Sequence, residues 1–304
     1  MVLLVDTVAL VRHRGDLSAA SRVKTLGQAV ALIGGFEGLQ SPFVVKPNLC
    51  THPSWDITRF ATTNARMVEA LVQLALAEER HLSVKIVESD SNDKFANEET
   101  FTKYGYRDLE ERLRRSGFDV SLVSLSQPPL VTFKYNGLYF DQLELHELLT
   151  QSKYFASVAV AKSHPTTYIT GTIKNMFGLL PKKRKGEYPH GSTKFSDLIL
   201  DLTKYANPDL CVIDAIVGLE GVVTGRPRRL NAIIVGKKPV CADATMARLI
   251  GFAPERIRHL VEGEKLGLGT INPEILGETL ESMRVEFKPP KKLGPAALTS
   301  DIEA

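Results

Sequence analysis

Continuous apolar runs, separated by longer stretches with helical periodicity, constrain the fold of this chain most. Seven runs predict strands at Val2–Val11, Phe43–Lys46, Ser83–Glu88, Val120–Leu125, Phe155–Ala161, Leu210–Ala215 and Ala232–Gly236. Several are apolar throughout, which is typical of strands buried on both faces of a parallel sheet. The stretches between them predict helices at Ala19–Ile33, Thr63–Glu78, Glu98–Ser116, Lys194–Tyr205, Ala242–Ile250 and Pro254–Glu264. The alternation indicates an α/β fold, with a mostly parallel sheet flanked by helices.

Two segments depart from this alternation. Gln127–Asp141 alternates apolar and polar residues around Asn136-Gly137, which predicts a small antiparallel hairpin insertion. Beyond Pro289 the sequence is rich in Pro and Ala, and we expect residues 291–304 to form a flexible tail. Residues 1–290 are enough for one domain, or for two lobes that share a site.

Composition excludes several classes of protein. A formal net charge of +3 over 304 residues argues against a nucleic-acid binder. No stretch approaches the roughly 18 consecutive apolar residues of a membrane span, and the apolar N-terminus carries Asp6 early, so it resembles a first strand more than a signal peptide. Cys50, Cys211 and Cys241 form no CxxC pair, which argues against a zinc ribbon or an iron–sulfur cluster. Three unpaired thiols indicate a reducing, cytoplasmic location. Homo-oligomer formation stays open.

Polar residues follow the predicted strands, where ligands bind in open α/β sheets. These residues are Lys46–Asn48, Glu88–Asp90, Lys162–His164, Asp214 and the glycine-containing loop 218–225. Five such endings in one chain predict a site built from strand ends. Within it, Glu88, Asp214 and Glu220 are expected to be supporting carboxylates. Thr63 is expected to open a helix or hold an anion, and Asp243 to cap the helix that begins near it.

Residues 161–190 form the strongest candidate segment. Its lysines, hydroxyls and glycine suit a phosphate or carboxylate, since ammonium, hydroxyl and backbone N–H groups all donate to anions. The GxxxxGK[ST] order of a P-loop is absent, and an ordinary solvated loop is the alternative. The basic run Lys182–Lys185 is either a solvated loop or a lid with a hinge at Gly186. The predicted anion-binding residues are Lys46, Asn48, Thr63, Lys162, Thr170, Thr172 and Asn175.

Three residues of this segment could carry chemistry. His164 follows a predicted strand beside lysines, which would lower its pKa and keep it neutral as a base or metal ligand. His190 could act as a base or a metal ligand, or be structural. Lys174 lies in an apolar setting, where a lysine can become a nucleophile or extend its ammonium to the surface.

The ordered motifs resemble a known family. KPNL, K-x-H-x(5)-TG-x-x-KN-x-FG, a basic loop ending in His, IDAIVGLEG and VGKKPVCADATMARLIGF are similar to DUF362 proteins over residues 40–270. Many such proteins carry an added ferredoxin-like domain, whose cysteines are missing here, so no iron–sulfur cluster is expected.

A second, more distant resemblance is to nickel-dependent lactate racemases. His164, Lys174 and His190 have the spacing of a His, Lys and His in that family. The resemblance implies that Lys174 anchors a nickel-pincer nucleotide, that His190 binds the metal, with His164 as a further candidate ligand, and that His164 is an acid/base. However, TYITGTIK is bulkier than the glycine-rich segment of the racemases. The cofactor therefore stays open between a metal ion and a pincer-like nucleotide.

Together these features predict an enzyme that acts on a small carboxylate- or phosphate-bearing molecule. The expected reaction is proton or hydride transfer of a racemase or epimerase kind, with His164, Lys174 and His190 as catalytic residues. The alternative is an anion- or nucleotide-binding protein without chemistry. A nucleic-acid or membrane partner is not expected.

Overall fold

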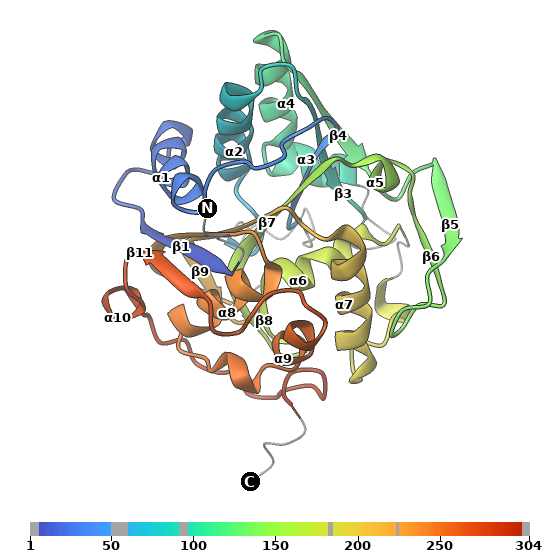
Figure 1. Cartoon of the computed structure of the whole chain (residues 1–304), viewed down its shortest axis with the longest axis vertical. Coiled ribbons are helices and arrows are strands. Elements are labelled where there is room, and N and C mark those ends of the chain that lie inside the picture. The colour runs from blue at the N-terminus through green and yellow to red at the C-terminus, as the bar shows by residue number, and fades with distance from the viewer. Residues whose placement is uncertain (1–5, 50–59, 91–96, 182–184, 223–224, 300–304) are drawn as a thin grey trace.

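A nine-stranded sheet forms the centre of the chain (Figure 1). The computed structural model describes residues 6–49, 60–90, 97–181, 185–222 and 225–299. The strands are β1 (Thr7–Arg12), β2 (Phe43–Pro47), β3 (Ser83–Glu88), β4 (Asp119–Ser124), β7 (Tyr154–His164), β8 (Tyr168–Thr170), β9 (Leu210–Glu220), β10 (Arg226–Gly236) and β11 (Glu274–Gly277). Their order is β11-β1-β10-β9-β7-β2-β3-β4, and β8 pairs with β7.

The strands from β9 to β4 are parallel to their neighbours, and antiparallel pairs join β10 to β9 and to β1. The carboxyl ends of β2, β3 and β7 therefore meet at one edge of the sheet. This arrangement confirms the predicted α/β fold with a mostly parallel sheet. Residues 2–5 of the predicted first strand lie outside the described residues.

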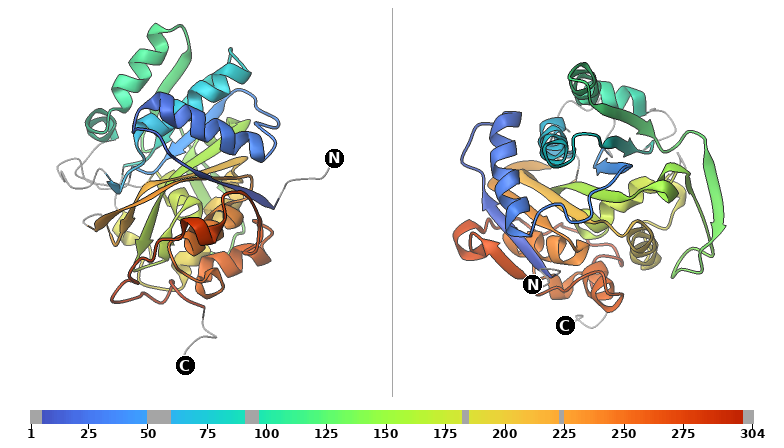
Figure 2. Two further views of the ribbon diagram at one scale, coloured as in Figure 1. Left: turned by 90° about the vertical axis from the view of Figure 1, so that its left-hand side faces the viewer. Right: turned by 45° about the horizontal axis from the view of Figure 1, so that its top comes forward.

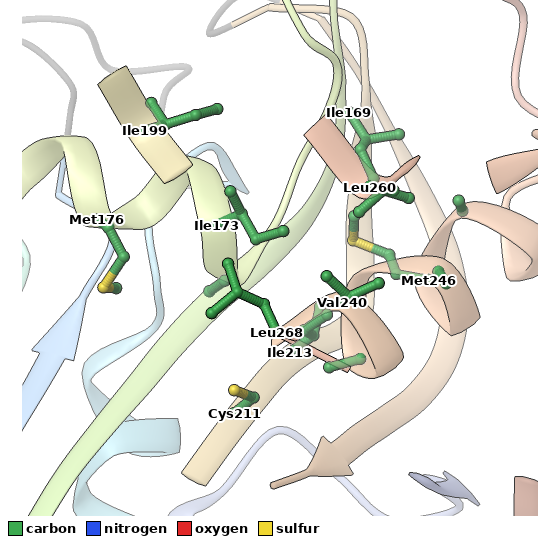
Figure 3. Close-up of a cluster of buried hydrophobic side chains, with 14 of the residues drawn as sticks. Ile169, Ile173, Met176, Ile199, Cys211, Ile213, Val240, Met246, Leu260 and Leu268 are labelled. Carbon is green, nitrogen blue, oxygen red and sulfur yellow. The ribbon is translucent and has the colours of Figure 1, made fainter. Parts of the chain in front are cut away.

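Helices cover both faces of the sheet, and Figure 2 shows the two layers with the sheet between them. The elements are α1 (Ala19–Leu32), α2 (Ala65–Glu78), α3 (Asn97–Lys103), α4 (Tyr106–Arg115), α5 (Leu148–Gln151), α6 (Thr172–Asn175), η2 (Met176–Leu179), η3 (Lys185–Glu187), α7 (Lys194–Ala206), α8 (Pro239–Leu249), η4 (Pro254–Arg256), α9 (Arg258–Lys265) and α10 (Leu280–Met283). One apolar cluster joins α1, α2 and α4 to the sheet, and another joins α6, α7, α8 and α9 to its other face. Figure 3 shows part of the second cluster, in which Ile173 of α6 lies among Ile213, Val240 and Leu260.

The helix predictions needed four corrections. The expected helix Pro254–Glu264 is the 3-10 helix η4 followed by α9, which begins at Arg258. The expected helix Glu98–Ser116 is two helices, because Gly105 adopts a left-handed conformation with φ of 79° between them. The helix expected from Ala242 begins at Pro239, a residue favoured in the first turn. Thr63 does not cap α2; Asn64 does, and its side chain accepts from the N–H of Arg66.

The hairpin prediction is confirmed. β5 (Leu130–Lys134) and β6 (Gln142–His146) pair antiparallel, and Asn136 has a φ of 55° in the loop between them. The carboxylate of Asp201 on α7 accepts the N–H groups of residues 138–140 and holds that loop against the domain.

The expected flexible tail packs against the domain as far as the structure describes it. Ala296 and Ala297 are buried, and Leu298 forms a β-bridge with Ile257. The hydroxyl of Ser196 donates to the carbonyl of Ala296. Residues 300–304 lie outside the described residues.

Candidate functional site

A cavity of about 510 Å³ lies at the carboxyl ends of β2, β3 and β7, beside α6 and η2; we call it the strand-end cavity. Four lysines line it: Lys46, Lys162, Lys174 and Lys185. The other polar lining residues include Asn48, Glu88, Ser89, His164, Thr170, Asn175 and His190. The structure therefore brings nine of the predicted site residues to one cavity, from segments as far apart as β2 and the loop before α7.

The floor of the cavity contains a buried ion pair. Nζ of Lys46 lies 2.7 Å from Oε1 of Glu88, and both side chains are almost fully buried. The same carboxylate accepts the backbone N–H groups of Leu49 and Ser89 at 3.0 Å each. A charge buried this deeply needs such partners. Gly178 passes directly over the pair, and a Cβ there would collide with both side chains.

Asn175 connects α6 to the sheet. Its amide nitrogen donates to the carbonyl of Lys46 and to the hydroxyl of Ser157, both at 3.0 Å. Nζ of Lys46 donates in turn to the Asn175 amide oxygen at 3.4 Å. This network fixes the position of α6, and thereby the position of Lys174, relative to β2.

Asp243 holds the start of α6 from the other side. Its carboxylate accepts the N–H of Thr172 at 2.6 Å and that of Ile173 at 2.9 Å. Burial raises the pKa of Asp243 to about 7, although these two hydrogen bonds favour the charged form. The expectation that Asp243 caps its own helix is wrong: it lies inside α8 and caps α6 instead.

His164 ends β7 and is held by its own turn. Its Nδ1 accepts the backbone N–H of Thr166 at 3.0 Å. Burial, followed by the charges of Lys174, Lys162 and His190, lowers the pKa of His164 well below its usual value. The ring is therefore neutral at pH 7.

His190 lies between two aromatic rings. It stacks on Phe195 with ring centroids 4.5 Å apart and meets the edge of Phe177 at 4.9 Å. Its Nδ1 lies 3.2 Å from the carbonyl oxygen of Tyr188. Burial and the charge of Lys174 lower its pKa, while the hydrogen bond to Tyr188 raises it.

Two further lysines of the cavity contact aromatic faces. Nζ of Lys174 lies 5.8 Å from the ring centre of Phe195, and Nζ of Lys185 lies 5.6 Å from that of Phe177. Lys185 also donates to the hydroxyl of Ser89. Residues 182–184 of the basic run lie outside the described residues, so the lid prediction is not examined by the structure.

Four predicted site residues do not line the cavity. The hydroxyl of Thr63 accepts the N–H of Asn48 and donates to the carbonyl of Val158. It therefore connects the chain after β2 to β7 without lining the cavity. Thr172 is buried at the start of α6. Asp214 pairs with Arg22 on the α1 side of the sheet, and Glu220 pairs with Arg228 and accepts the N–H of Lys288. These two carboxylates are therefore structural partners of arginines.

Sequence reasoning missed several lining residues. Ser89 was seen only as part of a strand-end run, and Phe177 and Gly178 were taken as an apolar continuation of the loop. The signal for Phe177 was its place between Lys174 and Lys185 in the sequence; in the structure its ring contacts Lys185 and His190. The signal for Gly178 was weak, because a close approach to Lys46 and Glu88 is visible only in the fold.

The arrangement offers many donors to an anion and few ligands to a metal ion. Among the residues that the structure describes, no group of three or more His, Cys, Asp or Glu side chains could hold a metal. Within the same residues no helix has the length and apolar character needed to cross a bilayer. The lysines, amides and hydroxyls that line the cavity are groups that can donate hydrogen bonds to an anion.

The fold and the cavity define an α/β protein with a basic site at the strand ends of a mostly parallel sheet. The chain belongs to the family described as "Domain of unknown function (DUF362)", whose match covers residues 44–248 and confirms the family predicted from the motifs.

Individual proteins resemble the chain to different extents. Thylakoid-associated protein sll1697 of a Synechocystis strain is 24% identical over 312 residues, which cover 96% of this chain and 90% of that protein. Ribosomal protein uL6 of Solidesulfovibrio magneticus is 38% identical over 80 residues, covering 24% of this chain and 44% of that protein. Among solved structures, the lactate racemase apoprotein from Thermoanaerobacterium thermosaccharolyticum matches with a TM-score of 0.46 and 10% identity, over 82% of this chain and 57% of the racemase chain.

Proposed function

We propose that this protein is an enzyme that binds a small carboxylate- or phosphate-bearing molecule in the strand-end cavity and moves a proton on it, in a racemase- or epimerase-like reaction. One observation carries the proposal: four lysines and two neutral histidines line a single cavity. Among its described lining residues Glu88 is the single carboxylate, and Lys46 already pairs with it. The net positive charge of the lining favours an anion.

The same charges support proton transfer beside a carboxylate. Loss of a proton from that carbon places a second negative charge on the carboxylate oxygens. Fixed ammonium groups stabilise such a charge as it develops, because they are already in place and need no reorganisation. A neutral imidazole is the side chain best suited to exchange the proton near pH 7.

Two measurements test the proposal. Binding of inorganic phosphate and of malonate, followed by calorimetry, tests the anion site; we expect binding in the wild type and its loss in Lys174→Ala. Incubation with a panel of chiral 2-hydroxy and 2-amino acids in D₂O tests the chemistry. We expect deuterium at the carbon next to the carboxylate for at least one acid. His81, an exposed residue outside the cavity, supplies the control His81→Gln. Anion binding without exchange for any acid would favour a binding protein without chemistry.

We further propose that the site can hold a nucleotide-like cofactor attached to Lys174. Lys174 and His190 lie on one wall of a cavity whose volume is in the range of nucleotide sites. Since the described residues offer no three-ligand cluster, a metal there would take most of its ligands from the cofactor itself. Such a group would supply an electron sink. Intact mass spectrometry of protein from its own host, with elemental analysis, would show an adduct on Lys174 or its absence.

We propose a reducing compartment, the cytoplasm, for this activity. Cys211 and Cys241 are free thiols buried in the core, while Cys50 lies outside the described residues. The name of the Synechocystis relative associates that protein with thylakoids. Fractionation of host cells would distinguish the cytoplasm from a membrane-associated location. Recovery of the protein with membranes would contradict the proposed cytoplasmic location.

A further inference from the structure

The two histidines of the strand-end cavity each use Nδ1 for a backbone group of their own loop, but in opposite senses. Nδ1 of His164 lies 3.0 Å from the backbone nitrogen of Thr166. Nδ1 of His190 lies 3.2 Å from the carbonyl oxygen of Tyr188. In each case the ring nitrogen that the backbone does not use is Nε2.

These partners determine which nitrogen of each ring carries the proton. An amide N–H can only donate, so Nδ1 of His164 must present its lone pair, and the proton of the neutral ring lies on Nε2. A carbonyl oxygen can only accept, so Nδ1 of His190 must carry the proton and its Nε2 must present a lone pair. The two rings are therefore opposite tautomers.

Their surroundings keep both rings neutral and oriented. Burial and the neighbouring lysines lower both pKa values, so neither ring gains a second proton near pH 7. The ring of His190 is held between the face of Phe195 and the edge of Phe177. Among the described residues, Nε2 of neither ring has a hydrogen-bond partner, and both histidines line the cavity.

We infer that His190 accepts the proton through Nε2, and that His164 donates a hydrogen bond from Nε2–H to the anionic group of the substrate. This division of roles rests on the proposed function of the same cavity. It reverses the sequence-based expectation for His164, because a ring whose Nδ1 is engaged by an N–H and whose Nε2 is protonated has no site for another proton.

The step balances as a carbon-acid reaction. The C–H bond beside the carboxylate breaks, its proton moves to Nε2 of His190, and its electron pair stays on the substrate as an enediolate. His190 becomes an imidazolium ion whose Nδ1–H still donates to Tyr188. The enediolate oxygen accepts the hydrogen bond from His164, and return of the proton from His190 or from solvent completes the exchange. No oxidant or reductant is required.

Long-range ¹H–¹⁵N correlation spectra of the full-length protein at pH 7.5 test the tautomers directly. His164→Gln and His190→Gln assign the signals, and His81→Gln serves as the control. We expect a protonated Nε2 in His164 and a protonated Nδ1 in His190. Added inorganic phosphate should shift the Nε2 signal of His164 most.

Affinity and exchange test the roles. Loss of a hydrogen bond to a charged ligand should weaken phosphate binding about tenfold or more in His164→Leu. His164→Gln, whose side-chain N–H can still donate, should recover most of that affinity. His190→Gln should bind phosphate as the wild type does and lose deuterium exchange.

The outcomes separate this inference from the proposed function. Phosphate binding with both rings in the same tautomer, or with His190 protonated on Nε2, would overturn the inference alone. Opposite tautomers with no effect of phosphate or malonate on either ring, and no exchange, would overturn the assigned roles together with the proposed function.

Discussion

Two buried ion pairs involve residues of the same sheet, and only one of them borders a large cavity. Lys46 and Glu88 lie 2.7 Å apart and line the strand-end cavity of about 510 Å³. Arg22 and Asp214 lie 3.4 Å apart beside a much smaller space of about 50 Å³. A buried charge is therefore a poor marker of a site. The convergence of several cations on open space is a better one.

The difference follows from the alternation of side chains along a strand. In β9, Ile213 and Ala215 belong to the cluster on the α6 side, whereas Val212 and Ile216 belong to the cluster on the α1 side. Alternate residues of a strand face the same side, so Asp214 points to the same face as Val212 and Ile216 and meets Arg22 of α1. Lys46 points to the same face of β2 as Val44. That face is the α6 side, where the cavity lies.

Removal of Glu88 should have the largest effect on stability. Glu88→Ala leaves the ammonium of Lys46 and the N–H groups of Leu49 and Ser89 without this carboxylate. We expect a loss of about 3–5 kcal/mol in the free energy of unfolding, measured by urea titration. Glu111→Ala breaks an exposed pair with Arg115 on α4 and should cost less than about 1 kcal/mol. Equal losses in the two variants would contradict the importance of the buried pair.

Asp214→Asn should separate stability from binding. The change keeps the side-chain volume but leaves Arg22 with no carboxylate in this pair, so we expect a loss of about 3 kcal/mol. Phosphate affinity should stay at the wild-type value, because Asp214 lies outside the strand-end cavity. In Lys46→Met, by contrast, phosphate affinity should fall. A weakened affinity in Asp214→Asn would place this pair in the site after all.

Gly171→Ala should disturb the wall of the cavity from within. A Cβ at this position would collide with the carboxylate of Asp243, which holds the start of α6. We expect a loss of about 2 kcal/mol in thermal or urea unfolding and weaker phosphate binding. Gly186→Ala is the matched control, since Gly186 also lines the cavity but, apart from its chain neighbours, no atom of the described residues lies within 4 Å of the added carbon. If Gly171→Ala and Gly186→Ala had the same stability and phosphate affinity, α6 would tolerate the displacement that the added carbon causes.

A buried histidine outside the cavity, His259, should make the stability of the protein depend on pH. His259 is fully buried outside the cavity, both ring nitrogens lack partners among the described residues, and burial lowers its pKa to about 3. Because the unfolded chain binds the proton more readily, His259 makes the wild type lose stability as the pH falls from about 6.5 toward 3.

His259→Leu removes that contribution. Between pH 6.5 and 4 the stability of the variant should fall less steeply than that of the wild type, by as much as about 1.4 kcal/mol per pH unit. At pH 7 the variant should be at least as stable, because an unpartnered buried polar group is gone. Urea titrations across this range check both expectations, and parallel pH profiles would contradict them.

The sequence could predict that most of the candidate residues line one cavity, because the evidence for their positions was local. Lys46, Glu88 and His164 each end a recognisable apolar run, and strands β2, β3 and β7 are neighbours in the sheet. Parallel pairing then places these residues at one edge. The apolar runs and turn signals likewise predicted the sheet, its helical layers and the hairpin.

What the sequence could not predict depends on contacts between distant segments. The cap on α6 comes from Asp243, 71 residues after Thr172, and no local pattern separates it from an ordinary helix cap. Asp214 and Glu220 looked like site carboxylates because their arginine partners lie on other elements or beyond a turn. The tautomers of His164 and His190 depend on single backbone groups whose directions only the fold defines.

The long-range cap that Asp243 provides for α6 has a consequence for the order in which the nascent chain folds. Strands β2, β3, β4 and β7 can pair once residue 164 has left the ribosome. The helix that carries Lys174, however, gains its cap only after α8 has been synthesised, which includes residue 243. During translation the chain therefore passes through a stage with a nearly complete sheet and an unfinished ligand site. In a ribosome-bound intermediate of this kind, the start of α6 would lack its cap until residue 243 had emerged.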